Sequence, residues 1–262
     1  MDLQLKGKKA LVTGSTAGIG FAAARALAAE GASVVINGRG QERVDAAIRE
    51  IRKLHPDADV SGIAADGSNA AGCSKIIRAF AQVDILVNNL GIFEPKPFEK
   101  IPDEDWLRMF EANVMSGVRL SRHYLAGMRE KNWGRIVFVS SESAVQIPAE
   151  MIHYGMTKTA QISVARGIAE TIAGTGITVN SVLPGPTASE GVEKFIAQMG
   201  GNATPADFEA EFFRTIRPTS LLKRFATVDE VASMIVYLCS PLASATNGAA
   251  LRVDGGVIRS IL

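Results

Sequence analysis

The chain has 262 residues, of which 47% are hydrophobic and 21% are charged, and its formal net charge is +1. This length suits one large α/β domain or two small ones, and the near-neutral charge gives no electrostatic reason to expect nucleic acid or an anionic membrane as a partner. The charge therefore leads us to expect small-molecule partners. Two cysteines and three histidines without metal-type spacing predict no metal site, and they suit the reduced thiols of a cytoplasmic protein. We find neither a signal pattern nor an apolar run near the ~20 residues of a membrane span, so we expect a soluble protein.

Short apolar runs alternate with helical patterns along the whole chain. The expected strands are Lys9–Thr13, Ser33–Asn37, Val60–Ala65, Ile85–Val87, Arg135–Ser140, Ile177–Val182 and Ala249–Val253. The expected helices are Phe21–Glu30, Gln41–Leu54, 69–81, 103–130, 152–173 and 228–239. This alternation is typical of βαβ units. It predicts a Rossmann-type, doubly wound parallel sheet of about seven strands with helices on both faces, in a single domain over residues 1–262.

One long segment, Pro184–Thr219, has no clear periodicity and contains four prolines. Short helices are expected at Glu190–Gln198 and Pro205–Arg214. Irregular segments of this length in compact domains are usually functional, so residues 186–219 are predicted to form a substrate loop or lid. The phenylalanines within it suit either an apolar substrate or a lid that packs on itself.

A glycine turn follows the first expected strand, with the spacing Gly14-x-x-x-Gly18-Ile19-Gly20. Glycines let a backbone approach phosphate groups, and a helix N-terminus attracts anions. The turn therefore predicts a dinucleotide site; a tight turn without a ligand is the alternative. The residues assigned to it are Gly14, Ser15, Thr16, Gly18, Ile19 and Gly20.

The second expected strand ends in Asn37-Gly38-Arg39 rather than in an acidic residue. An Asp or Glu there would bind the ribose 2′-hydroxyl of NAD, whereas an arginine suits the 2′-phosphate of NADP. Asn37 and Arg39 therefore favour NADP(H), with NAD(H) possible. Arg39 could instead be a solvated loop residue, or it could pair with Glu42.

Tyr154 and Lys158 lie four residues apart in an expected helix, which makes their side chains neighbours. A nearby cation lowers the pKa of a phenol from its ordinary value of about 10, so such a tyrosine can shuttle a proton. A surface helix with a chance pair is the alternative. His153 is adjacent to Tyr154, but consecutive helix residues point about 100° apart and do not easily share one reacting atom.

Together, the motifs between Leu5 and Gly256 resemble those of the short-chain dehydrogenase/reductase family. They are Thr13-Gly14-x-x-x-Gly18-Ile19-Gly20, Asn88-Asn89-Leu90-Gly91, Ser141 upstream of Tyr154-x-x-x-Lys158, and Pro184-Gly185. The resemblance implies hydride transfer between a nicotinamide cofactor and an alcohol or carbonyl. It also implies a homotetramer or homodimer.

The resemblance assigns four catalytic roles. Tyr154 matches the family's acid/base, and Lys158 matches the residue that lowers its pKa and binds the nicotinamide ribose. Ser141 matches the serine that polarises the substrate oxygen. Asn113 matches the asparagine that holds a water relaying protons to the lysine.

The resemblance further implies that Tyr154 and Lys158 contact the cofactor, together with residues that follow three later strands. These are Asp66, Gly67, Asn88, Leu90 and Gly91 around the adenosine, and Pro184, Gly185 and Thr187 around the nicotinamide. Leu90 stands where alanine is usual, and Gly67 stands where a larger residue is commoner. We therefore expect looser packing around the adenine and a bulkier group near the cofactor.

The motifs are compatible with three functions. The leading one is an NADP(H)-dependent carbonyl reductase, or the reverse alcohol dehydrogenase, acting on a small molecule. The alternatives are a reductase of 3-oxoacyl thioesters on acyl carrier protein, and a non-catalytic NADP(H)-binding sensor on the same fold.

Overall fold

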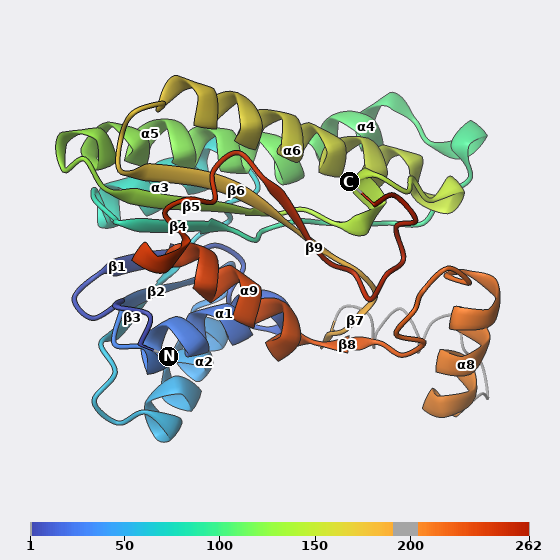
Figure 1. Ribbon diagram of the computed structural model, residues 1–262, viewed down its shortest axis with the longest axis horizontal. Helices are drawn as coiled ribbons and strands as arrows, with labels where there is room; N and C mark the ends of the chain where they lie inside the picture. The colour runs from blue at the N-terminus through green and yellow to red at the C-terminus, as the bar shows by residue number, and fades with distance from the viewer. Residues whose placement is uncertain (1, 191–203, 262) are drawn as a thin grey trace.

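Seven parallel strands form the sheet on which the molecule is built (Figure 1). The computed structural model describes residues 2–190 and 204–261. In sheet order the strands are β3 (Val60–Ala64), β2 (Ser33–Gly38), β1 (Lys9–Val12), β4 (Ile85–Asn88), β5 (Gly134–Val139), β6 (Ile177–Pro184) and β9 (Ala250–Val253). The predicted doubly wound α/β sheet is confirmed, and each strand lies within two residues of its expected bounds.

Helices cover both faces of the sheet, because successive strand side chains point to opposite sides. In β1, for example, Ala10 and Val12 belong to one core cluster and Leu11 belongs to the other. In Figure 1, α1, α2 and α9 lie below the sheet and α4, α5 and α6 lie above it. The helices are α1 (Gly18–Ala29), α2 (Gln41–Leu54), α3 (Ala70–Ala79), α4 (Asp103–Phe110), α5 (Ser116–Glu130), α6 (Ile152–Thr171), α8 (Pro205–Thr215) and α9 (Val228–Cys239).

The strand order reverses between β1 and β4, which are neighbours in the sheet although two strands separate them in the chain. In doubly wound sheets, ligands bind in the crevice beyond the carboxyl ends of the strands at this point. The glycine turn follows β1 there, and Asn89 to Gly91 follow β4. The topology therefore brings two of the four sequence motifs to one edge.

The expected helix over 103–130 is not continuous. A π-helical segment, η2 (Glu111–Met115), separates α4 from α5. The side chain of Asn113 within it is tied to other elements: its Oδ1 accepts from the backbone nitrogen of Ile92 at 2.7 Å, and its Nδ2 donates to Thr157 Oγ1 at 3.0 Å. Single π-helical turns inside α-helices are frequent at functional sites.

A small two-stranded parallel sheet, which was not predicted, joins the start of the segment after β6 to the residues that precede α9. Its strands are β7 (Thr187–Ala188) and β8 (Ala226–Thr227). Helix α8 confirms the expected helix at 205–214. The other expected helix, at 190–198, lies outside the described residues apart from Glu190. None of the helices in the described parts of the chain is long and apolar enough to cross a membrane.

Candidate active site

A cavity of about 870 Å³ opens at the carboxyl ends of the strands, with a smaller one of about 280 Å³ beside it. The larger cavity is lined by the glycine turn, the ends of β5 and β6, the start of α6, and residues from α8. The smaller cavity is lined by the ends of β2 and β3. Both include Gly14, Thr16 and Gly91, so together they form one continuous crevice.

The glycine turn has the conformation that its glycines allow. Gly14 and Gly18 have φ values of 60° and 58°, in the left-handed region that favours glycine. Asn89 Nδ2 holds the turn by donating to the carbonyls of Thr13 and Gly14, each at 3.0 Å. A Cβ at Gly20 would come within 2.4 Å of the same nitrogen.

Not every residue predicted in the turn faces the crevice. Gly14, Thr16, Gly18 and Ile19 line it. The side chain of Ser15 is buried, and its Oγ accepts from the backbone nitrogen of Asn37 at 3.0 Å. Ser15 and Gly20 therefore shape the turn from behind, next to Asn89, which is absent from the predicted site.

The smaller cavity has a basic rim at the end of β2, where Asn37, Arg39 and Arg43 line it. Arg39 is exposed, and no ion pair joins it to Glu42 or to another acidic residue that the structure describes. Arg43 pairs with Glu190 at 2.6 Å. The arginines give this end of the crevice positive charge.

Asp66 also lines the smaller cavity, directly after β3. Its Oδ1 accepts hydrogen bonds from the backbone nitrogen and the hydroxyl of Ser68, at 3.1 and 2.7 Å. These bonds leave its Oδ2 without a hydrogen-bond donor among the described residues. One carboxylate oxygen of Asp66 therefore remains to accept from a ligand.

The two departures at Gly67 and Leu90 occur side by side. A Cβ at Gly67 would lie 3.2 Å from Leu90 Cδ1, closer than ordinary contact. The leucine side chain thus occupies the space beside the glycine. The expectation of loose packing treated the two positions separately, whereas in the structure each accommodates the other.

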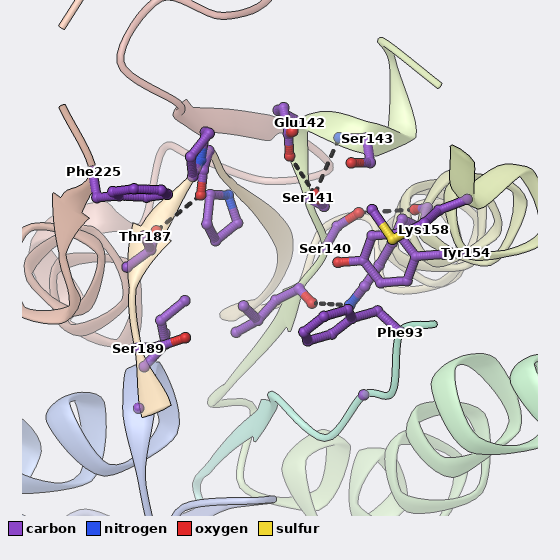
Figure 2. A pocket seen from close by; sticks show the side chains of 18 of the residues that line it. Phe93, Ser140, Ser141, Glu142, Ser143, Tyr154, Lys158, Thr187, Ser189 and Phe225 are labelled. Carbon is purple, nitrogen blue, oxygen red and sulfur yellow. Dashed lines mark hydrogen bonds between the residues drawn. The ribbon is translucent and has the colours of Figure 1, made fainter. Parts of the chain in front are cut away.

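Tyr154 and Lys158 lie on α6 beside Ser141, which follows β5 (Figure 2). Lys158 Nζ donates to the carbonyl of Val139 at 2.9 Å and to Gln161 Oε1 at 3.2 Å. It lies 5.6 Å from the centroid of the Tyr154 ring. An ammonium has three donors, so the contacts with described residues leave one for a ligand.

The charges around Tyr154 differ from the expectation. Burial, and after it the negative charge of Glu142, raise the pKa of the Tyr154 phenol above its ordinary value, while Ser141 and Arg217 act in the opposite direction. Burial lowers the pKa of Lys158 to about 8, so most of this side chain is protonated at neutral pH. Lys158 was expected to lower the pKa of the tyrosine, but its ammonium is held by Val139 and Gln161.

Gln161 connects Asn113 to Lys158. Its Nε2 donates to the backbone carbonyl of Asn113 at 2.6 Å, and its Oε1 accepts from Lys158. A Cβ at Gly91 would lie 3.3 Å from Lys158 Nζ and 3.4 Å from Asn113 Oδ1, so the three residues meet. Gln161 is absent from the predicted site, although it lies one helical turn after Lys158.

The remaining predicted residues divide into two groups. Pro184, Gly185 and Thr187 line the larger cavity, and Figure 2 shows Thr187 across it from Tyr154. Asn88 lines neither cavity: its side chain is buried, and its Nδ2 donates to Ser121 Oγ on α5 at 3.1 Å. Among residues 2–190 and 204–261, no group of His, Cys, Asp and Glu side chains could hold a metal ion.

A buried ion pair next to Ser141 is also absent from the predicted site. Ser141 Oγ donates to Glu142 Oε2 at 2.5 Å, and Arg217 Nε donates to Glu142 Oε1 at 3.0 Å. Both charged side chains are less than a tenth exposed. They are 75 positions apart in the chain, so no local sequence pattern indicated the pair.

The sequence and the fold of the chain are similar to those of known proteins. Residues 14–258 match a protein-family model described as enoyl-(acyl carrier protein) reductase. The chain is 50% identical to the uncharacterized oxidoreductase YvaG of Bacillus subtilis, over the full length of both. It is 35% identical to D-beta-hydroxybutyrate dehydrogenase of Cupriavidus necator, covering 96% of this chain and 98% of the relative. Its fold matches the crystal structure of L-sorbose reductase from Gluconobacter frateurii complexed with NADPH and L-sorbose, with a TM-score of 0.91, 31% identity and full coverage of both chains.

The contact between Gly67 and Leu90 predicts a strong energetic coupling. Replacing Gly67 with valine should destabilise the protein by about 1–3 kcal/mol, because the new methyl groups overlap the leucine. The same change in a Leu90→Ala background should cost much less. Thermal unfolding of the two single variants and the double variant measures this coupling, and additive effects would contradict the packing described.

Proposed function

The chain belongs to the short-chain dehydrogenase/reductase family and is an oxidoreductase, and we propose that it transfers hydride between NADP(H) and a carbonyl or secondary alcohol. One observation carries the proposal. The hydroxyl of Ser141, the phenol of Tyr154 and the ammonium of Lys158 come from two elements and converge on one wall of the large cavity. A carbonyl oxygen seated there would meet the proton donors that its reduction requires.

The residues of the crevice fit a nicotinamide dinucleotide. The left-handed glycines open the backbone at the N-terminus of α1, where a pyrophosphate is favourable. The remaining donor of Lys158 suits the ribose hydroxyls near the nicotinamide. When bound, the cofactor supplies or accepts the hydride.

In the reductive direction, Tyr154 gives its proton to the substrate oxygen. The raised pKa of its phenol keeps it protonated before the reaction. Ser141 donates a hydrogen bond to the same oxygen and stabilises the charge that develops on it. Ser141 and Arg217, which act to lower the pKa of the phenol, favour the phenolate that remains, while Lys158 binds the nicotinamide ribose. In alcohol oxidation the same groups act in reverse.

Arg39 and Arg43 support NADP(H) over NAD(H). They place two guanidinium groups on the rim of the cavity assigned to the adenosine, and guanidinium groups bind phosphates with paired hydrogen bonds. The L-sorbose reductase structure contains NADPH. A non-catalytic sensor would have no need for Ser141, Tyr154 and Lys158 to share a cavity, so the enzymatic function is favoured.

We also propose that residues 186–219 form a substrate loop or lid and that the protein forms a homotetramer or homodimer. Phe208 and Phe212 of α8 line the large cavity, which supports the first proposal. Exposed apolar side chains on and beside α4 support the second, since Phe98 is 61% exposed and Leu107 is 70% exposed.

Removing the phenolic hydroxyl should separate catalysis from binding. In Tyr154→Phe, kcat for ketone reduction should fall by about 10²–10⁴-fold, the usual contribution of a positioned acid or base. The dissociation constant for NADPH, measured by fluorescence titration, should stay close to that of the wild type. Substantial residual turnover would remove Tyr154 from the acid/base role.

Arg39 should select the phosphorylated cofactor. Arg39→Asp should weaken NADPH binding by about 10- to 100-fold, the loss expected for hydrogen bonds to a charged group, and should leave NADH binding nearly unchanged. Lys53→Asp, an equal charge change at the far end of α2, is the matched control. An unchanged ratio of the two affinities would place Arg39 outside the cofactor site.

The lowered pKa of Lys158 predicts how cofactor affinity depends on pH. The protonated lysine is present below about pH 8 and is lost as the pH rises through that value, so NADPH affinity should fall there. The 2′-phosphate of the cofactor titrates lower, near pH of about 6. Lys158→Arg keeps a charge at all these pH values and should flatten the decline. The same decline in both proteins would show that another group causes it.

A further inference from the structure

The polar end of the large cavity lies next to Ser141 and is formed by Glu142, Glu150 and Arg217. Arg217 Nη1 lies 3.4 Å from Glu150 Oε1, in addition to the Glu142 contact described above. Unlike the buried pair, Glu150 is 46% exposed. Two carboxylates thus flank one guanidinium within reach of the reacting atoms.

Fold stability alone does not account for this arrangement. Removing two charges from water is costly, and a buried ion pair is often no more stabilising than apolar residues of the same size. Here both partners line the same cavity as Ser141 and Tyr154. An ion pair retained at that position therefore indicates a role in recognition.

The charge of this end selects against acidic molecules. Glu142 and Glu150 together outweigh Arg217 by one negative charge, which would repel a substrate carboxylate at close range. Lys158, on the same wall, would repel an ammonium group. Among the described lining residues, the acidic and basic side chains balance at three each, with Arg43 and Glu190 completing the set. An uncharged substrate fits this balance best.

The hydrogen-bonding capacity indicates what that substrate carries. Arg217 uses Nε and Nη1 in its contacts, and its Nη2 has no acceptor among the described residues. The carboxylates of Glu142 and Glu150 are acceptors. A hydroxyl group both donates and accepts, so neighbouring hydroxyls can bond to the guanidinium and to the carboxylates at the same time.

The opposite wall suits the carbon chain of the same molecule. Phe225 lies across the cavity from Tyr154 in Figure 2, and Phe212 packs against it with ring centroids 5.1 Å apart. Aromatic rings provide flat apolar surfaces for C–H groups. The cavity therefore combines an aromatic wall with a charged, hydrogen-bonding end.

We propose that Glu142, Glu150 and Arg217 bind the hydroxyl groups of an uncharged polyhydroxylated ketone or the corresponding alcohol, and that they reject carboxylate substrates. The proposal rests on the function proposed above. It places the hydroxyls beside Ser141, so that the carbonyl faces Tyr154. It also disfavours the 3-oxoacyl thioester alternative, whose acyl chain has no hydroxyls for these residues to bind.

Three four-carbon ketones test it: erythrulose, 2-butanone and acetoacetate. Each has a chain of four carbons with the ketone on the second carbon from one end. They differ in their hydroxyl groups and in their charge. With NADPH and the full-length protein, kcat/KM for erythrulose should exceed both others by at least about tenfold, the value of a hydrogen bond to a charged group. A preference for acetoacetate, or equal rates with 2-butanone, would overturn the proposal.

Charge-neutral variants test the residues themselves. Glu142→Gln and Glu150→Gln should each reduce the ratio of kcat/KM for erythrulose to that for acetoacetate by roughly tenfold, because each removes one repelling charge and one strong acceptor. Glu150 is half exposed, so its variant should fold even if the buried Glu142→Gln does not. Glu170→Gln, an exposed carboxylate outside the cavity, is the control. Ratios that stay at the wild-type value in both cavity variants would contradict the assignment.

Failure of this proposal is distinguishable from failure of the general function. Turnover of 2-butanone without a preference for erythrulose would reject the substrate class and leave the reductase intact. If no ketone is reduced, calorimetric titration of erythrulose and acetoacetate into the NADPH complex still decides the recognition question. Tighter binding of erythrulose would support the site, and tighter binding of acetoacetate, or no binding of erythrulose, would overturn it.

Discussion

Two hydrogen bonds between the end of β5 and helix α6 hold the site together. Lys158 Nζ donates to the carbonyl of Val139, and Ser140 Oγ donates to the carbonyl of Lys158 at 2.8 Å. Because the bonds run in both directions, the strand fixes the lysine while the lysine's own backbone fixes the strand end. Ser141, the next residue, is thereby held beside Tyr154. The relative positions of Ser141, Tyr154 and Lys158 thus depend on one contact between a strand and a helix.

The same contact explains why so many polar groups can be buried here. Lys158 has its charge solvated by Val139 and Gln161, Gln161 is bound to Asn113, and Asn113 is bound to Ile92 and Thr157. Buried polar groups are tolerable when each has a partner, and a connected network restricts all of its members. The π-helical turn at Asn113 fits this scheme, because the backbone carbonyl of Asn113 bonds to Gln161. The helix is irregular at the point where Asn113 joins this hydrogen-bond network.

The sequence predicts what depends on local patterns and on motifs, and little beyond that. Alternating strands and helices, with their bounds, follow from hydrophobic periodicity, and Tyr154 and Lys158 become neighbours through helix geometry alone. The interruption of the helix near Asn113 could not be predicted, because its partners Ile92 and Thr157 lie on other elements. Gly67 and Leu90 each looked anomalous, and only their contact shows that they compensate. Glu142 and Arg217 carried no motif, so their pairing required the fold.

Residues that were found from motifs and residues that only the fold brings together have different places in the cavity, and this difference bears on substrate specificity. The residues found from motifs lie where the proposed cofactor and reacting oxygen would bind, and the chemistry there would be common to any carbonyl. Glu142, Glu150 and Arg217 lie one step further out, where a substrate differs from its competitors. Glu142 belongs to both regions, since one carboxylate oxygen accepts from Ser141 and the other from Arg217. It also raises the pKa of Tyr154. A substrate hydroxyl that took over part of this carboxylate's hydrogen bonding would weaken its hold on the Ser141 proton, leaving the serine hydroxyl available to the carbonyl. Recognition of the substrate and activation of its oxygen would then be coupled through a single side chain.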